Sequence, residues 1–203
     1  MKYESNDIKI RLPDRKDANQ KCLDALAVDE GSMPPAEIFH SYTGIGGLHG
    51  LDYVDYGNYH DFSEAKKEIE QGQFFTPDAL CKWVVDCVRP DNRHRVADLT
   101  CGKGSFFNYL PNEEKIYGCE IEPDSFAIAK HLFDKANLTL GDVRTYDPRM
   151  FFHVVIGNPP YNLNWTYDGK RMNSQVAYIL KSSGALVPCR HTCYYCARHI
   201  FGG

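Results

Sequence analysis

The chain has 203 residues, of which 43% are hydrophobic and 25% are charged, and its formal net charge is −4. This length accommodates one core of ordinary domain size with a modest appendage, which excludes a large multi-domain enzyme. The negative balance argues against a protein that holds nucleic acid through a broad basic surface, because phosphate neutralisation supplies most non-specific affinity. If the protein binds nucleic acid, the contact surface is therefore expected to be small and local, or to be provided by another protein or segment.

Neither a membrane span nor a signal peptide is indicated by the hydropathy pattern. No apolar run approaches the roughly 18 residues that a span requires, and residues 1–4 lack the apolar core of a leader. Five of the eight cysteines are scattered without metal-type spacing, as in a reducing compartment: Cys22, Cys81, Cys87, Cys101 and Cys119. We therefore expect a soluble, cytoplasmic protein that makes no membrane contact and uses no metal.

Residues 1–62 form a polar N-terminal extension in which Gly and Pro clusters interrupt any long periodicity. We expect irregular structure there, with one short helix near residues 18–26. The pattern changes at Ser63, where residues 63–70 are typical of one or two helical turns. The catalytic core is accordingly expected to cover residues 63–188.

The next helix is predicted to begin at Thr76, a capping residue, and Pro77, which suits a first helical position. Short apolar strands are then expected at 95–99, 115–119, 138–140 and 152–156, with a helix opened by Pro123 between the second and the third. Strands alternating with helices predict a mostly parallel sheet with right-handed crossovers and helices on both faces, an α/β, Rossmann-like fold. The first of these helices carries an apolar stripe made of Leu80, Trp83, Val84, Cys87 and Val88.

A glycine-containing loop follows the first of these strands, at the position where a doubly wound sheet binds a nucleotide ligand. Gly102 and Gly104 have no Cβ, so the backbone can turn sharply and approach a ligand closely. The loop is not a dinucleotide fingerprint, because Phe107 stands where the third glycine would be. It is not a phosphate-binding P-loop either, because Lys103 is followed by glycine instead of Ser or Thr. A single Gly-x-Gly is more often a structural turn.

Three acidic residues at successive strand ends favour the ligand-binding interpretation of this loop. Asp98 ends the first strand, and Glu120 ends the second, 22 residues later, where its carboxylate can accept hydrogen bonds from two ribose hydroxyls. Asp142 follows the third strand. Each acid alone is more simply a surface residue, but neighbouring parallel strands bring all three to one rim of the sheet.

The segment 154–161, Val-Val-Ile-Gly-Asn-Pro-Pro-Tyr, is the most specific feature of the chain. An exocyclic amino group is a poor nucleophile because its lone pair is delocalised into the ring. Accepting its two N–H hydrogens, through the side-chain oxygen of Asn158 and the carbonyl of Pro159, would localise that lone pair. Proline suits this role because it has no N–H and its φ is fixed. Tyr161 can stack on the base; the alternative is a proline-stiffened loop with an incidental tyrosine.

Together these motifs resemble, in order and spacing over about residues 70–185, the gamma-type N6-adenine DNA methyltransferases, which include the modification subunits of restriction systems. The resemblance implies an S-adenosylmethionine-dependent methyltransferase fold, with Asn158, Pro159, Pro160 and Tyr161 catalytic. It places the methionine part of the cofactor near Asp98, the ribose at Glu120 and the cofactor's adenine at Asp142. The implied cofactor-binding set is Phe75, Thr76, Pro77, Asp98, Thr100, Cys101, Gly102, Gly104, Phe106, Glu120, Ile121, Asp142 and Asn158. Lys103 departs from the small residue expected in the loop; it either pairs with the carboxylate of the cofactor's methionine part or is solvated, and we expect it to be solvated.

The implied reaction is direct transfer of the methyl group from the sulfonium to N6 of a flipped-out adenine, without a covalent enzyme intermediate. The motif also suits N4 of cytosine or the side-chain amide of a protein glutamine, although the Phe-Thr-Pro segment at 75–77 favours adenine. A third alternative is a fragment that binds S-adenosylmethionine without activity. The partner would be DNA, held by a recognition region largely absent from the chain; the sequence does not indicate an oligomeric state.

Residues 189–203 form an atypical Cys/His tail where the family continues with an apolar strand. One interpretation is a zinc knuckle built on Cys193 and Cys196 with His191 or His199. The other is a frameshift, because displacing the reading frame by one base restores apolar codons, and we favour it. On this hypothesis the chain is truncated after the catalytic motif and the fold is incomplete at its C-terminus.

Overall fold

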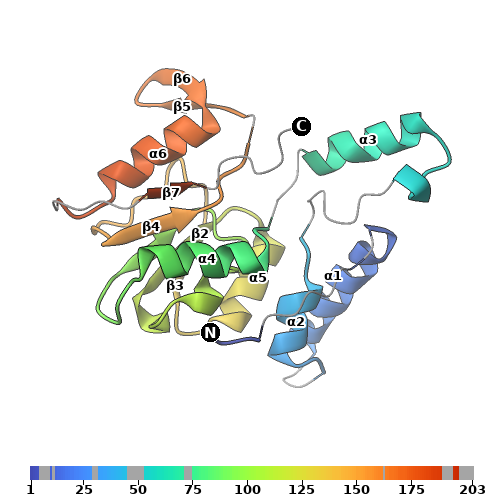
Figure 1. The fold of residues 1–203 in the computed structure, drawn as a ribbon, viewed down its shortest axis with the longest axis horizontal. Helices are drawn as coiled ribbons and strands as arrows, with labels where there is room; N and C mark the ends of the chain where they lie inside the picture. Colours follow the sequence, from blue (N-terminus) through green and yellow to red (C-terminus); the bar gives the residue numbers. More distant parts are fainter. Residues whose placement is uncertain are drawn as a thin grey trace.

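The centre of the computed structural model is a five-stranded sheet with the strand order β3-β2-β1-β4-β7, in which every pair of neighbours is parallel (Figure 1). The structure describes residues 1–4, 10, 12–28, 32–44, 53–70, 75–161, 163–188 and 194–196. The strands are β1 (Val96–Asp98), β2 (Ile116–Glu120), β3 (Asn137–Leu140), β4 (Val154–Gly157) and β7 (Tyr194–Cys196). The predicted Rossmann-like α/β fold is confirmed, with the first four strands within about two residues of their expected positions.

Hydrophobic side chains alternate between the two faces of the sheet and form two separate clusters. In β1, Val96 belongs to the larger cluster, whereas Ala97 belongs to the smaller one, as the two-residue period of a strand requires. The larger cluster includes residues of α4 (Asp78–Val88) and α5 (Pro123–Leu132). The smaller cluster receives Tyr178 from α6 (Ser174–Gly184). Helices therefore cover both faces, as expected.

The N-terminal segment is more helical than its polar composition indicates. Helix α1 (Leu12–Ala27) and helix α2 (Pro35–Ser41) lie beside α5, and Cys22, Ile38 and Phe39 are buried in the larger cluster. These few apolar residues are buried together in one cluster, although they come from two helices, and a composition average does not reveal this. The predicted division after residue 62 stays a prediction, since this segment and the sheet share one cluster.

Helix α4 begins at Asp78, two residues after the expected capping Thr76, whose side chain makes no cap hydrogen bond because Pro77 is the N-cap residue. The buried face also differs from the expected stripe. Trp83 and Cys87 are exposed, whereas Cys81, Val84 and Val85 are buried. One residue of rotation corresponds to about 100° around a helix, so a short stripe fixes the buried face only approximately.

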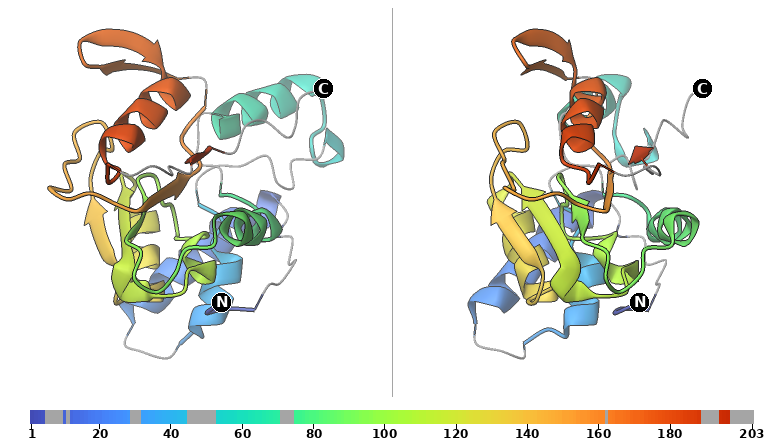
Figure 2. Two further views of the ribbon diagram at one scale, coloured as in Figure 1. Left: turned by 60° about the vertical axis from the view of Figure 1, so that its left-hand side comes forward. Right: turned by 90° about the vertical axis from the view of Figure 1, so that its left-hand side faces the viewer.

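A β-hairpin that the sequence analysis did not anticipate follows the Asn-Pro-Pro-Tyr motif. Strands β5 (Asn164–Tyr167) and β6 (Lys170–Asn173) pair antiparallel, and the two turn residues, Asp168 and Gly169, both have positive φ, 49° and 71°. Asp-Gly with this geometry is typical of a two-residue type I′ turn. Figure 2 shows the hairpin and α6 on the side of the molecule away from α1 and α2.

The remaining elements are helix α3 (Tyr59–Glu70) and three short 3₁₀ helices, η1 (Tyr53–Asp55), η2 (Phe107–Tyr109) and η3 (Glu113–Lys115). Among the described residues, no helix is long and apolar enough to cross a membrane. Strand β7 extends the sheet beside β4. Of the candidate zinc ligands in the tail only Cys196 lies in the described part of the chain, so the zinc and frameshift hypotheses both fall outside it.

Candidate active site

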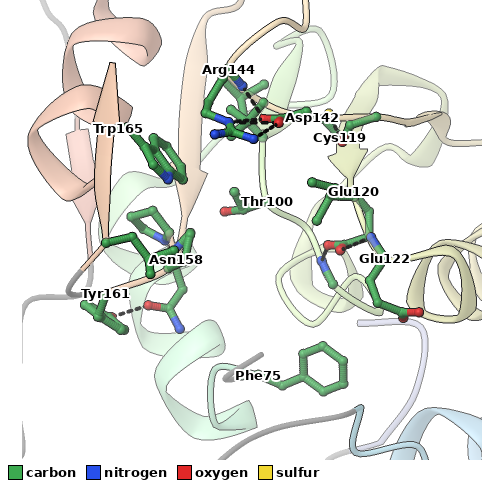
Figure 3. Close-up of a pocket in the computed structure, with 18 residues that line it drawn as sticks. Phe75, Thr100, Cys119, Glu120, Glu122, Asp142, Arg144, Asn158, Tyr161 and Trp165 are labelled. Carbon is green, nitrogen blue, oxygen red and sulfur yellow. Dashed lines mark hydrogen bonds and ion pairs between the residues drawn. The ribbon is translucent and has the colours of Figure 1, made fainter. Parts of the chain in front are cut away.

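A pocket of about 470 Å³ opens at the carboxyl ends of the parallel strands, where such sheets bind their ligands (Figure 3). It is bounded by the loops after β1, β2, β3 and β4 and by the beginning of the hairpin. Residues from every predicted motif line it: Phe75, Thr100, Gly102, Glu120, Ile121, Asp142, Asn158, Pro159, Pro160 and Tyr161. The structure therefore brings into one cavity residues that are up to 86 positions apart in the sequence, from 75 to 161.

The glycine loop and Glu120 are joined through backbone amides. Gly102 donates its N–H to Oε2 of Glu120 at 2.7 Å, and Glu122 donates its N–H to Oε1 at 2.8 Å. Burial raises the pKa of the Glu120 carboxyl, and these two amides oppose the shift. Backbone amides of the glycine loop and of the turn after β2 therefore fix the direction of this carboxylate at the edge of the pocket.

Gly102 is required where it stands. Its φ is 55°, and a Cβ at this position would lie 2.6 Å from the ring of Phe75. The loop therefore turns in a left-handed conformation directly beneath an aromatic ring, which only glycine allows without displacing that ring. This close approach is the structural reason why Phe75 and the glycine loop line the same end of the pocket.

Asp98 lies behind the wall of the pocket. Its side chain is 2% exposed, and its Oδ1 accepts a hydrogen bond from the amide of Thr100 at 3.0 Å. Burial raises the pKa of Asp98 to about 7, with the Thr100 amide opposing the shift and the charge of Glu120 adding to it. A Cβ on Gly157 would lie 2.7 Å from Oδ1 of Asp98, so Gly157 makes room for this carboxyl. The contact of Asp98 with a cofactor stays a prediction.

Asp142 is paired with Arg144, a pocket residue that the sequence analysis missed. The guanidinium Nε lies 3.0 Å from Oδ1 and 2.8 Å from Oδ2, and Nη2 also donates to the carboxylate. Hydrogen bonding from Arg144 holds the pKa of Asp142 below its usual range. The sequence signal was an arginine two residues after the acid, a spacing too common to single out.

The Asn-Pro-Pro-Tyr motif at 158–161 forms the opposite wall. The Tyr161 hydroxyl donates a hydrogen bond to Oδ1 of Asn158, so the ring and the amide face one another (Figure 3). The carbonyl of Pro160 accepts a hydrogen bond from the hydroxyl of Ser174 at 2.7 Å. Pro159 is almost fully buried, which is consistent with a rigid support under the motif.

Trp165 is the largest pocket residue that the sequence analysis did not predict. It lies on β5 and lines the cavity between Arg144 and Asn158 (Figure 3). The Asp-Gly pair at 168–169 was the available signal, because a type I′ turn predicts a hairpin and hence an alternating face for residue 165. Other lining residues outside the prediction are Leu99, Cys119, Glu122, Gly141, Val143 and Leu163.

Some predicted cofactor residues support the pocket from behind instead of lining it. Gly104 has a φ of 85°, and a Cβ there would lie 2.6 Å from Phe107 in the core. Cys101 and Phe106 are buried in the same larger cluster. The predicted residues outside the pocket lining are Thr76, Pro77, Asp98, Cys101, Gly104 and Phe106; their binding roles stay predictions.

Lys103 is not solvated as expected. Its ammonium group donates to the carbonyl of Phe39 and, at 2.8 Å, to that of Tyr42, at the end of α2. It also lies 5.5 Å from the ring centre of Phe75. Burial lowers the pKa of Lys103 to about 8. The glycine loop is thereby tied to the N-terminal helices, a contact that no local sequence pattern predicts.

The model of the N-6 DNA Methylase family matches residues 59–197, about two thirds of the chain, including every motif that lines the pocket. The chain belongs to this family. The match leaves α1 and α2 outside, and it includes the hairpin, α6 and β7. The predicted resemblance is confirmed at the level of the family.

Two curated relatives are similar to part of this chain. A type II methyltransferase of Paramecium bursaria Chlorella virus XZ-6E is 30% identical over 105 residues, 50% of this chain and 27% of the relative. A type I restriction enzyme methylase subunit of Mycoplasma pneumoniae is 26% identical over 144 residues, 58% of this chain and 26% of the relative. The chain thus matches about a quarter of the length of these relatives.

A solved structure supports the fold assignment. The crystal structure of a protein from Listeria monocytogenes, described as a class I S-adenosylmethionine-dependent methyltransferase, aligns with a TM-score of 0.50 at 10% identity. The alignment covers 87% of this chain and 63% of the other. At this identity the likeness concerns the fold alone.

Proposed function

We propose that this chain carries the catalytic site of a DNA methyltransferase that transfers a methyl group from S-adenosylmethionine to N6 of adenine. The observation that carries the proposal is the placement of the Asn-Pro-Pro-Tyr motif, Glu120 and Asp142 around one cavity. Family membership supports the reaction type, and relatives of the restriction-modification kind support DNA as the substrate.

The residues present suit the proposed cofactor. A cavity of about 470 Å³ lies within the usual range for small-molecule sites, roughly 300–1,000 Å³. The carboxylate of Glu120 suits ribose hydroxyls, and Asp142, paired with Arg144, lies further along the same rim, where the adenine ring of the cofactor would lie. Phe75 and Gly102 stand at the end left for the methionine part. The lining holds three carboxylates, those of Glu120, Glu122 and Asp142, and one guanidinium, that of Arg144, and this excess of negative charge favours a ligand that carries a positive sulfur.

The chain's own residues are arranged to activate an amino group. Oδ1 of Asn158 and the carbonyl of Pro159 can accept the two N–H hydrogens, which concentrates the nitrogen lone pair on the side facing the cofactor. An amide oxygen has two acceptor sites, so Asn158 can receive this hydrogen bond beside the one from Tyr161. When bound, S-adenosylmethionine would supply the methyl group from its sulfonium, whose sulfur would keep the electron pair of the broken S–C bond as a neutral thioether. Asn158 and Pro159 would hold the amino group while its nitrogen forms the new N–C bond and loses one proton to water.

A base paired in a duplex does not reach such a pocket, so the target adenine must be flipped out at a cost of a few kcal/mol. Stacking on the Tyr161 ring offsets part of this cost, by roughly 1–3 kcal/mol. The substrate is therefore proposed to be DNA with the target base extruded.

Two measurements on the purified chain test the proposal. Calorimetry with S-adenosylmethionine measures binding, and mass spectrometry of nucleosides after incubation with unmethylated DNA identifies the product. We expect binding and N6-methyladenine. N4-methylcytosine would transfer the assignment to the cytosine alternative, and binding without any methylated nucleoside would support the inactive fragment or the protein-glutamine alternative.

A further inference from the structure

The first residue of α6 contacts the catalytic motif directly. Ser174 is fully buried, and its hydroxyl donates to the carbonyl of Pro160 at 2.7 Å. The amide of Ser174 donates to the carbonyl of Leu163 at 2.9 Å. Asn173 caps the helix by accepting the N–H of Gln175. The beginning of α6 is thus fixed to both ends of the segment that runs from the motif into the hairpin.

One turn further along α6, Tyr178 contacts the other side of the same motif. Its hydroxyl accepts the amide N–H of Leu99 at 3.3 Å and lies 3.5 Å from the carbonyl of Ile156. Gly157 has no space for a Cβ beside this hydroxyl. Residues i and i+4 share one helix face, so a single face of α6 contacts strand β4 at Ile156, just before the motif, and the motif itself at the carbonyl of Pro160.

The hydrogen bond from Ser174 acts on the torsion that the prolines leave free. The proline ring fixes φ, and a proline has no backbone N–H. Its carbonyl is therefore the one backbone group of a proline that can accept a hydrogen bond and so restrict ψ. The Pro160 carbonyl belongs to the peptide plane that continues into Tyr161. Holding that carbonyl sets ψ of Pro160, and with it the direction in which the Tyr161 side chain leaves the backbone.

We propose that Ser174 is a positioning residue for methyl transfer: its hydroxyl fixes the Pro160 peptide plane and thereby holds Tyr161 and the Asn158 amide in the geometry that receives the target base. The inference rests on the proposed function. Ser174 does not line the pocket and acts through Pro160.

The chain offers a matched control on the same helix. Ser182 is eight residues further along α6, is 2% exposed, and its hydroxyl has no hydrogen-bond partner in the described part of the chain. The substitutions Ser174→Ala and Ser182→Ala therefore remove the same atom from two buried positions of one helix. Only Ser174→Ala removes a hydrogen bond to the motif.

Two readouts are compared in these variants and in Ser174→Thr, which retains a hydroxyl. For Ser174→Ala we expect kcat for DNA methylation to fall roughly ten- to a hundredfold. The affinity for S-adenosylmethionine should stay within about twofold of wild type, because Ser174 lies outside the pocket lining. Hydrogen exchange of peptides covering residues 161–165 should accelerate. Ser182→Ala should change neither quantity, and Ser174→Thr should recover at least part of kcat.

Equal exchange at residues 161–165 in the two alanine variants would overturn the inference, whether or not the wild-type chain methylates DNA. Faster exchange without a loss of kcat in an active protein would overturn it as well. A wild-type chain that forms no methylated product contradicts the proposed function. In that case hydrogen exchange at residues 161–165 still decides whether Ser174 holds the motif in place. Unfolding of Ser174→Ala, seen as faster exchange throughout the sheet, would make Ser174 a structural residue and count against the proposal.

Discussion

The hydroxyl of Tyr161 donates a hydrogen bond to Oδ1 of Asn158, the atom proposed to receive the target amino group. The two residues are three positions apart, on either side of two prolines, so the motif is closed on itself by its own side chains. This hydrogen bond holds the aromatic ring beside the amide. The ring is proposed to stack on the target base, whereas the hydroxyl orients Asn158, and substitutions can separate these two roles.

Replacing Tyr161 by Phe removes the hydrogen bond to Asn158 and keeps the ring, whereas Tyr161→Ala removes the stacking surface as well. Because stacking on a base is worth roughly 1–3 kcal/mol, we expect kcat/KM to fall about 5- to 150-fold in Tyr161→Ala. Tyr161→Phe should stay within about fivefold of wild type. Steady-state methylation kinetics check this, and equal losses in the two variants would assign the role to the hydroxyl.

Asn158→Ala removes the acceptor for the target amino group. We expect kcat to fall by about a hundredfold or more, as is typical when a group that stabilises developing charge is lost. S-adenosylmethionine affinity should stay within a few-fold, measured by calorimetry. A large loss of cofactor affinity instead would place Asn158 among the cofactor contacts.

Trp165 provides a direct optical test of the pocket. The chain contains two tryptophans, and the other, Trp83, is exposed on α4 and does not line the cavity. In a Trp83→Phe background we expect S-adenosylmethionine to change the intrinsic fluorescence with saturation, because the ligand fills the cavity that Trp165 lines. Unchanged emission, at concentrations where calorimetry detects binding, would place the cofactor elsewhere.

The buried carboxyl of Asp98 predicts a pH-dependent contribution to stability. Asp98 has a pKa of about 7 in the folded protein, against roughly 4 in an unfolded chain. Between these values the folded state retains a proton that the unfolded state has released, so the contribution of Asp98 to the free energy of unfolding falls as pH rises from about 4 to about 7, and is constant above.

Asp98→Asn removes this titration and keeps Oδ1 as the acceptor for the Thr100 amide. Urea unfolding of both proteins at about pH 4.5 and about pH 7.5 measures the effect. We expect the variant to gain stability relative to wild type as pH rises between the two. A difference that does not depend on pH would mean that the carboxyl titrates near its ordinary pKa in the folded state.

Lys103→Met tests the connection between the glycine loop and the N-terminal helices. The change keeps an apolar stem against Phe39 and Phe75, but leaves the carbonyls of Phe39 and Tyr42 without the ammonium donor. We expect a loss of about 1–3 kcal/mol in the free energy of unfolding, the usual cost of leaving a buried hydrogen-bonding group without its partner. Exchange in α2 should rise more than exchange in β1, and equal protection of α2 in the two proteins would contradict the connection.

Much of the fold and of the site could be predicted from the order of strands, helices and motifs along the chain. The alternation of strands and helices, the glycine loop and the acids at strand ends are local patterns, and parallel strands place their carboxyl ends on one rim. Thr100, Gly102, Glu120, Asp142 and the motif at 158–161 accordingly line the cavity where the sequence placed them.

The sequence by itself determined the family, the α/β sheet and the motifs around the pocket, because each depends on residues close together in the chain. Only the tertiary structure decided what those motifs touch. Arg144 pairs with Asp142, Lys103 joins α2, and Ser174 holds the Pro160 carbonyl. Asp98 is buried behind the pocket. The contacts of Lys103 and Ser174 and the burial of Asp98 depend on how separate elements of the fold pack together. The Asp142–Arg144 pair depends on the rotamers of two neighbouring side chains. A local pattern of residues specifies neither the packing nor the rotamers.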